Sequence, residues 1–395
     1  MRFLYIGPFR FPDGDAAASR VLNNARLFRD LGHYVEVLSF GGKYRNEDRI
    51  SNGEYVYDGV KYSITDDIDT HSWKERLLRY TWPNPNARKI IRKTIHKYDV
   101  VITYNTSLQM NLFLQRVCKK HHKKLILDLT EWTDAKETPG GKWLPVYWMN
   151  EWNMRVVQKR FKNIIPISHY LNNYYRDSFN LIIPPLISIQ DEKWNVFTVI
   201  NNPILVSFKG VRFIYAGRPD KKDLLENLIA AMLRVLKETD RIQLVVAGVS
   251  SEQATVYCSE EVLKKYSESF VFLGRIPQYI VPSYYHISDF SVIIREFSRK
   301  NMAGFPTKMA ESMASGCPVF INETSDLGMY AKDGQNAIIV KDYSVDRIEE
   351  GLHRILNLSK KQIDEMKAVS RSVGETNFDY RAYIKNAEEF INNLR

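Results

Sequence analysis

The fold is predicted mainly from residues Asp289–Val319, which read DFSVIIREFSRKNMAGFPTKMAESMASGCPV. Phe290–Ile294 is a mostly apolar run of strand length, and Gly304–Thr307 interrupts the chain before a helical pattern begins. Gly316 is placed to end that helix, and Cys317–Phe320 resume a strand. Such a loop directs free backbone N–H groups and the positive end of a helix dipole to one point, so we expect it to bind an anion, with phosphate as the natural choice.

The predicted helix has two unlike faces. Apolar residues recur on one side at the spacing that buries a face: Met309, Ala310, Met313 and Ala314. Polar residues occupy the other side: Lys308, Glu311, Ser312 and Ser315. Lys308 could neutralise a phosphate, and Glu311 could accept two hydroxyl hydrogen bonds from a ribose. The alternative is an ordinary amphipathic helix whose Lys and Glu are solvated.

The composition indicates a globular protein of two domains. The chain has 395 residues, 44% of them hydrophobic and 26% charged. Lys and Arg number 56 against 46 for Asp and Glu, a net charge of +10, which suits nucleic acid, an anionic membrane surface or a phosphorylated substrate. We expect no nucleic-acid partner, because basic and aromatic residues do not alternate as in single-strand binders.

The cysteines and the apolar runs bear on the compartment. Cys118, Cys258 and Cys317 are odd in number, widely spaced and without a CxxC, which argues against disulfides and a zinc site. We expect no metal and no cofactor. The N-terminal run is too short for a signal peptide, and no segment has the roughly 18 apolar residues of a membrane span. The expected location is the cytoplasm, with at most peripheral contact with the inner face of the plasma membrane.

The N-terminal half begins with a βαβ unit. Arg2–Ile6 is a predicted strand, a helix starts near Asp15, and Tyr34–Ser39 is the next strand. Parallel sheets bind ligands at the carboxyl ends of their strands, where the loop containing Gly14 would lie. Arg20, early in the helix, is a candidate for contacting an anionic acceptor group; alternatively it is solvated.

Two carboxylates follow a predicted strand at Leu125–Leu127. Asp128 and Glu131 would lie at its carboxyl end, where a doubly wound sheet places its chemistry, and both are candidate catalytic acids. Asp128 could instead serve as a helix cap or turn residue. Further along the chain, the aromatic segment Lys142–Lys162 could bind a membrane surface or line an acceptor cleft, although core packing is favoured.

The C-terminal half repeats the alternation of strand and helix after a proline-containing linker, predicted from Leu181 to about Gly210. Val211–Ala216 is a predicted strand followed by Gly217 and Arg218, with Lys221 and Lys222 close behind. Arg forks onto two oxygens and Lys adds a point charge, so this loop suits a pyrophosphate.

The run Gly304–Lys308, with Glu311 and Met313–Val319, resembles the donor-binding signature of retaining GT-B glycosyltransferases, in particular glycosyltransferase family 4 (group 1). A glutamate often opens that signature, but Ala303 stands there in this chain. The resemblance therefore leaves the sugar hydroxyls to another residue, Arg295 or Glu296.

The resemblance also implies roles for individual residues. Arg218 and Lys222 would clamp the donor diphosphate and act in catalysis; Lys222 is one residue off the commonest spacing, so Lys221 is the alternative. Backbone groups at Arg275 and Ile276 would contact the base. The expected donor-binding set is Gly217, Arg218, Lys222, Arg275, Ile276, Arg295, Glu296, Gly304, Phe305, Thr307, Lys308 and Glu311. Of the usual glycines after the first strand, only Gly14 carries over, as an acceptor-side residue beside Arg20.

The implied fold is α/β of GT-B type, with two Rossmann-like doubly wound domains facing across a cleft. Residues 1–190 would bind the acceptor, with a final helix at 379–395 packing back on them, and residues 191–378 would bind the nucleotide sugar. The implied enzyme is a retaining, metal-independent hexosyltransferase that uses a UDP- or GDP-sugar and a glycan or lipid-linked saccharide acceptor of a bacterial surface polysaccharide. A sugar-nucleotide 2-epimerase and a non-catalytic partner subunit are the alternatives.

Overall fold

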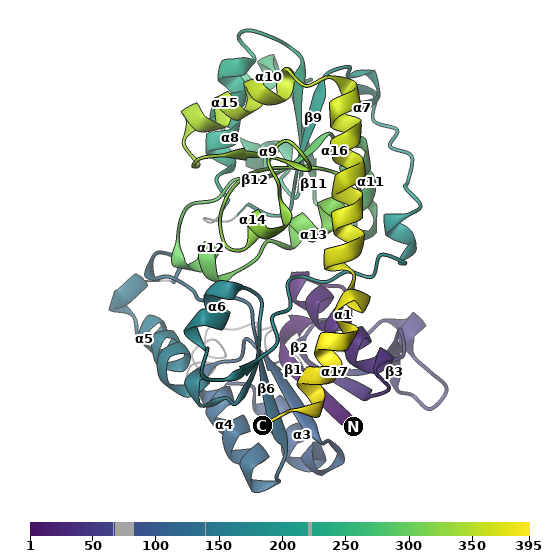
Figure 1. The fold of residues 1–395 in the computed structure, drawn as a ribbon, viewed down its shortest axis with the longest axis vertical. Coiled ribbons are helices and arrows are strands. Elements are labelled where there is room, and N and C mark those ends of the chain that lie inside the picture. The colour runs from purple at the N-terminus through teal and green to yellow at the C-terminus, as the bar shows by residue number, and fades with distance from the viewer. Residues whose placement is uncertain (66, 68–82, 139, 220–222) are drawn as a thin grey trace. The chain divides into compact units, whose positions relative to one another are not determined.

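The computed structural model describes residues 1–65, 67, 83–138, 140–219 and 223–395. Two compact units divide the chain (Figure 1): unit 1 contains Met1–Leu186 and Tyr380–Arg395, and unit 2 contains Ile187–Asp379. Each unit has its own sheet. None of the described helices has the length and apolar character needed to cross a membrane.

Unit 1 contains an eight-stranded sheet in the order β3-β4-β2-β1-β5-β6-β7-β8. Its strands are β1 (Arg2–Arg10), β2 (Tyr34–Gly41), β3 (Tyr55–Tyr57), β4 (Val60–Ile64), β5 (Val100–Tyr104), β6 (Lys124–Leu129), β7 (Asn163–Pro166) and β8 (Phe179–Asn180). Neighbouring strands pair in parallel except β3 and β4, the hairpin around Asp58-Gly59. Since β1 lies between β2 and β5, the order of winding reverses there.

Helices cover both faces of this sheet. They are α1 (Ala16–Asp30), α3 (Pro85–Thr94), α4 (Leu108–Lys120), α5 (Pro145–Trp152), α6 (His169–Tyr174) and α17 (Ile384–Asn392). Alternate residues of β1 face opposite ways: Phe3 and Tyr5 pack with α1 and α17, whereas Leu4 and Ile6 pack with α3 and α4. The part of β1 from Phe3 to Ile6 is apolar at every position because both of its faces are buried. The C-terminal helix α17 thus completes the core of unit 1.

Unit 2 contains a six-stranded, wholly parallel sheet in the order β11-β10-β9-β12-β13-β14. Its strands are β9 (Val211–Ala216), β10 (Ile242–Ala247), β11 (Phe270–Gly274), β12 (Phe290–Ile293), β13 (Val319–Asn322) and β14 (Ala337–Val340). The winding reverses at β9, between β10 and β12. Phe213 and Tyr215 face one core cluster, and Ile214 and Ala216 the other.

Ten α-helices are described in unit 2: α7 (Pro203–Ser207), α8 (Leu225–Val235), α9 (Ser251–Ala254), α10 (Glu260–Lys265), α11 (Val281–Ile287), α12 (Arg299–Ala303), α13 (Thr307–Ala314), α14 (Leu327–Tyr330), α15 (Val345–Leu356) and α16 (Lys360–Val373). The stretch Asp289–Val319 forms β12 and α13 as expected, and Gly316, at φ +69°, ends the helix. The short helix α12 was not expected. The prediction of two Rossmann-like α/β domains is confirmed.

The aromatic segment Lys142–Lys162 does not pack as expected. Trp143 is 94% exposed, Trp148 59% and Trp152 58%, so the prediction of core packing is wrong for these side chains. In α5, Tyr147 and Glu151 are buried, whereas Trp148 and Trp152, which directly follow them, are exposed.

Candidate functional site

A cavity of about 830 Å³ lies in unit 2 at the carboxyl ends of β9, β10 and β11. Four residues predicted from the sequence line it together: Gly217, Arg218, Arg275 and Ile276. The other lining residues include Gly248, Ser250, Gln253, Tyr257 and Gln278. Open parallel sheets bind ligands at this edge, where the strand order reverses.

Arg218 and Arg275 supply the positive charge of this cavity. Both side chains are exposed, and neither makes a hydrogen bond or an ion pair with another described residue. A guanidinium group presents paired donors that match two phosphate oxygens. The cavity therefore offers two unpaired cationic groups to an anionic ligand. Lys222, the other cation expected here, lies outside the described residues.

Two glycines allow the loops after β9 and β10 to approach each other. Gly217 has φ +128° and Gly248 has φ +116°, values that side chains disfavour. A Cβ atom on Gly248 would lie 2.4 Å from the carbonyl oxygen of Gly217, and one on Gly217 would lie 3.2 Å from Cε of Lys308. Lys308 therefore lies directly beside the loop that carries Arg218.

A buried ion cluster holds Lys308 in place. Its Nζ donates to Oδ2 of Asp223 at 2.6 Å, and Nε of Arg295 donates to Oδ1 at 2.8 Å. Tyr215 donates its hydroxyl to Asp223 at 2.7 Å, and its ring lies 3.6 Å from the Lys308 ammonium. Burial alone would raise the pKa of Asp223, but Lys308 and Arg295 outweigh it and hold this pKa well below its usual range.

This cluster bears on one of the two residues that were expected to contact the sugar hydroxyls. Arg295 is 5% exposed, pairs with Asp223 and does not line the cavity, so its predicted contact with sugar hydroxyls is corrected to an internal ion pair. Glu296 is half-buried and its carbonyl accepts from Nδ2 of Asn301 at 2.9 Å, and the contact of its carboxylate with sugar hydroxyls stays a prediction. The sequence reasoning missed Asp223; an acid directly after Lys222 at a strand end was the available signal.

The start of α13 is open to an anion. Thr307 is its first residue, Pro306 precedes it, and no side chain caps the first turn. Gly304 donates its N–H back to the carbonyl of Lys300 at 2.8 Å, which ends α12 just before this loop. The Phe305 ring is buried edge-on against Tyr330 and Phe378, so this side chain anchors the loop and is not available to a ligand.

Glu311 lies one turn further along α13. Its half-buried carboxylate has no hydrogen bond or ion pair with any described residue. Burial raises its pKa, although Lys193 and Lys308 act in the opposite direction. A partly desolvated acceptor group without a partner suits a ligand hydroxyl. Ala303, where the resemblance placed another carboxylate, is fully buried.

In unit 1 the predicted residues divide between core and surface. Arg20 is 3% and Asp128 0% exposed, and Nη2 of Arg20 donates to Oδ1 of Asp128 at 2.7 Å. Asp128 also accepts from Tyr5, and Arg20 donates to the carbonyl of Ile183 at 2.8 Å. The expected catalytic and acceptor-binding roles are corrected to a buried structural pair, and neither solvation of Arg20 nor a cap role for Asp128 is seen.

Glu131 and Gly14 are the other two predicted residues of unit 1. Glu131 is exposed and makes no hydrogen bond or ion pair within the described part of the chain. Gly14 is also exposed, and its N–H donates to the carbonyl of Arg10 at 2.8 Å. A Cβ atom at Gly14 would lie 2.6 Å from Cβ of Arg10, so this glycine keeps the loop after β1 tight.

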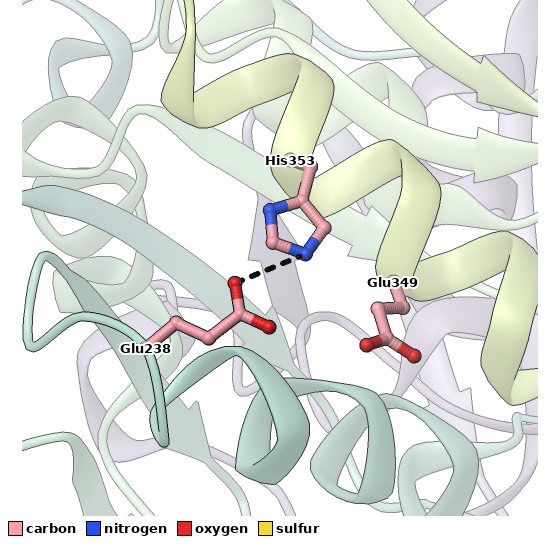
Figure 2. Close-up of side chains that lie close together, drawn as sticks. All are labelled: Glu238, Glu349 and His353. Carbon is pink, nitrogen blue, oxygen red and sulfur yellow. Dashed lines mark ion pairs between the residues drawn. The ribbon is translucent and has the colours of Figure 1, made fainter.

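One further group of side chains could offer three metal-ligand atoms. Glu238, Glu349 and His353 place these atoms within 4.8 Å of one another (Figure 2). His353 Nε2 lies 3.8 Å from a carboxylate oxygen of Glu238, and Glu349 already pairs with Arg234 at 2.9 Å. The group lies on the surface around α15 and contributes no residue to the cavity, so we treat it as an ion-pair network.

The chain is similar to known proteins in sequence over part of its length and in fold over all of it. Residues 205–371 match the family model for glycosyl transferases group 1. Sucrose-phosphate synthase of Thermosynechococcus elongatus is similar over 100% of this chain and 99% of its own, with a TM-score of 0.77 and 15% identity. HepE of Anabaena, in complex with UDP and glucose, covers 100% of both chains at a TM-score of 0.71 and 14% identity.

The catalytic domain of starch synthase IV from Arabidopsis thaliana, bound to ADP and acarbose, is also similar, over 100% of this chain and 99% of its own, with a TM-score of 0.72 and 13% identity. No curated protein sequence matches the chain. The fold and the family match define a glycosyltransferase with the GT-B fold. The match to the group 1 model covers residues 205–371, which is less than half of the chain. Membership of family 4 stays a prediction.

Proposed function

We propose that this protein transfers a hexose from a nucleotide-diphosphate sugar, a UDP- or GDP-sugar, to a glycan or lipid-linked saccharide, with retention and without a metal ion. The observation that carries the proposal is that Arg218 and Arg275, both unpaired among the described residues, line one cavity at the carboxyl ends of β9–β11. The comparison structures of HepE contain UDP or UDP-glucose, which supports this donor class.

The donor groups are distributed over the cavity and α13. Arg218 binds the diphosphate, Lys222 joins it, and the open first turn of α13 adds backbone N–H donors beside Lys308. Glu311 accepts hydrogen bonds from the ribose hydroxyls. The loop carrying Arg275 and Ile276 contacts the base.

In the transfer step the bond between the anomeric carbon and the phosphate oxygen breaks, and its electron pair stays on the departing diphosphate. The cationic groups and the N–H donors stabilise that charge. The acceptor hydroxyl oxygen bonds to the same face of the anomeric carbon, and its proton passes to the leaving diphosphate. Retention is proposed from the resemblance of the Gly304–Glu311 motif to retaining enzymes.

The acceptor is proposed to bind unit 1. A second cavity of about 480 Å³ lies in this unit. It is lined by Pro8 of β1, by Asn105 and Ser107 after β5, and by Met149 and Asn153. It lies where the winding of unit 1 reverses, which is the ligand-binding edge of such a sheet. The excess of basic residues supports a bacterial surface polysaccharide made beside an anionic membrane.

A panel of UDP-, GDP- and dTDP-sugars tests the donor. We expect one of them to raise the melting temperature and to be slowly hydrolysed, and Arg218→Ala and Glu311→Ala to abolish both effects. Arg347→Ala is the matched control, because this arginine pairs with Glu350 on α15 and does not line the cavity. A chain that binds none of the donors would contradict the proposal, and one that binds without hydrolysis or transfer would indicate a non-catalytic partner subunit.

A further inference from the structure

Unit 1 exposes a group of large apolar side chains on and just before α5. This helix is labelled in Figure 1. We name Trp143, Leu144, Trp148 and Trp152 the tryptophan surface; Leu144 is 44% exposed. The structure describes five tryptophans, and the remaining two, Trp132 and Trp194, are 2% and 4% exposed. All the exposed tryptophans that are described therefore lie within ten residues of one another.

These side chains form one continuous surface. Trp143, Trp148 and Trp152 line a shared hollow of about 550 Å³ together with Leu108, Pro145 and Met149. The indole of Trp148 donates to the carbonyl of Lys142 at 2.8 Å, which holds this ring against the turn before α5. Exposed apolar side chains are usually scattered, and a contiguous patch indicates an interaction surface.

The helical path continues past α5, and its exposed side becomes basic. A π-helical turn, Asn153–Val157, and a 3-10 turn, Gln158–Arg160, follow α5 directly. Arg155 and Lys159 are exposed on these turns, as Trp148 and Trp152 are on α5. Residues 140–163 contain Lys142, Arg155, Lys159, Arg160 and Lys162, and Glu151 as their one acid. Glu151 is buried and accepts from Arg155 at 2.7 Å and Trp132 at 2.9 Å.

We propose that the tryptophan surface and the cations beside it dock the protein on an anionic lipid bilayer. Indole rings favour the level of the lipid headgroups because they are apolar with one polar edge, and basic side chains next to them are attracted to anionic lipids. Tryptophans at one end of this segment can therefore lie at the level of the lipid headgroups, while the basic side chains at its other end contact anionic lipids. This assignment deepens the membrane contact contained in the proposed function and gives it a location.

Vesicle sedimentation with the full chain tests the docking. The probes are vesicles of phosphatidylcholine alone and vesicles with about 30% phosphatidylglycerol. We expect binding to the anionic vesicles that weakens at about 0.5 M NaCl. Trp143→Ala/Trp152→Ala should reduce partitioning by about tenfold or more. The matched control, Val199→Ser/Val206→Ser, removes two exposed apolar side chains of unit 2 and should bind as the unchanged protein does.

A second pair of variants tests how much the basic side chains contribute to vesicle binding. Arg160→Glu should weaken binding to anionic vesicles, whereas Lys361→Glu, on the exposed side of α16, should not. The proposal would be overturned if the protein did not bind vesicles, or if the tryptophan and control variants bound equally well. It would also be overturned if the protein bound no vesicles but self-associated, and Trp143→Ala/Trp152→Ala abolished the self-association. Nucleotide binding measured on the same samples separates this outcome from failure of the proposed function, because vesicle docking requires no donor.

Discussion

Lys308 donates its ammonium to Asp223 at 2.6 Å, although the sequence assigned this lysine to a phosphate. The carboxylate of Asp223 also binds Arg295 and Tyr215, so it positions two cations at the ends of β9 and β12. Lys308 remains next to Gly217 and contributes positive potential there. We therefore propose that direct contact with the leaving group falls first to Arg218, which is unpaired within the described part of the site.

Replacing Asp223 by Asn should destabilise unit 2 by about 3 to 5 kcal/mol, because Lys308 and Arg295 would remain buried without their counter-ion. The lowered pKa of Asp223 means that its stabilising effect is present above the ordinary aspartate pKa of about 3.9 and is lost as the pH falls toward the lowered value. Urea unfolding at several pH values measures this.

Asp346→Asn is the matched control, since Asp346 pairs with Arg234 on the exposed surface and its loss should have little effect. Equal stability of the Asp223 and Asp346 variants at neutral pH would contradict the assignment of Asp223 as the central anion.

Gly248→Ala should lower nucleotide affinity by about tenfold or more, because the added methyl group would meet the carbonyl of Gly217 and displace the loop that carries Arg218. Isothermal titration with the nucleotide found in the donor panel measures this. Gly334→Ala is the control: it also has a positive φ, at +74°, but nothing lies within 4 Å of an added Cβ atom. Similar losses of affinity in both variants would show that backbone strain alone is responsible.

Glu311 should make nucleotide binding pH-dependent. Its pKa is raised by burial, so the carboxylate becomes protonated at a higher pH than usual and can no longer accept from both ribose hydroxyls. Affinity should fall as the pH is lowered toward this raised pKa, and Glu311→Gln should bind more weakly at neutral pH with a flatter profile.

The pH dependence of stability that comes from Glu311 should run opposite to the pH dependence of nucleotide affinity. A raised carboxyl pKa means that the unmodified protein loses stability, relative to Glu311→Gln, as the pH rises through the folded pKa. The Gln variant should therefore be at least as stable at neutral pH. A variant that both unfolds more easily and binds less would point to misfolding in place of a lost ribose contact.

Asp128→Ala should destabilise unit 1 by about 3 to 5 kcal/mol, because the Arg20 guanidinium would remain buried without its carboxylate. Arg20→Met/Asp128→Leu should recover most of this loss. Chemical denaturation compares these variants with Asp13→Ala, whose partner Arg45 lies on the surface. Once the protein is folded, the KM for donor hydrolysis should be unchanged; a rise in KM with unaltered stability would restore the acceptor or catalytic role.

The sequence predicted elements better than side-chain partners. The Gly304–Gly316 pattern predicted α13 because its buried face recurs at helical spacing and Gly316 supplies the terminating backbone conformation. The strand-end loop containing Arg218 was predicted because a strand pattern ends there. Local patterns could not show that Asp128 and Arg20 form a pair, since they are 108 residues apart and meet only when β6 and α1 pack.

By itself, the sequence determined two α/β units and the family resemblance, because periodicity and turn residues are local properties. It also predicted that the loops at Arg218 and Gly304 bind phosphate. The tertiary structure decided which charges remain for a ligand: burial against distant residues pairs Arg295 and Lys308 with Asp223 and leaves Arg218, Arg275 and Glu311 without partners among the described residues. It also placed Trp143, Trp148 and Trp152 on the surface, since only one side of α5 packs against the rest of unit 1.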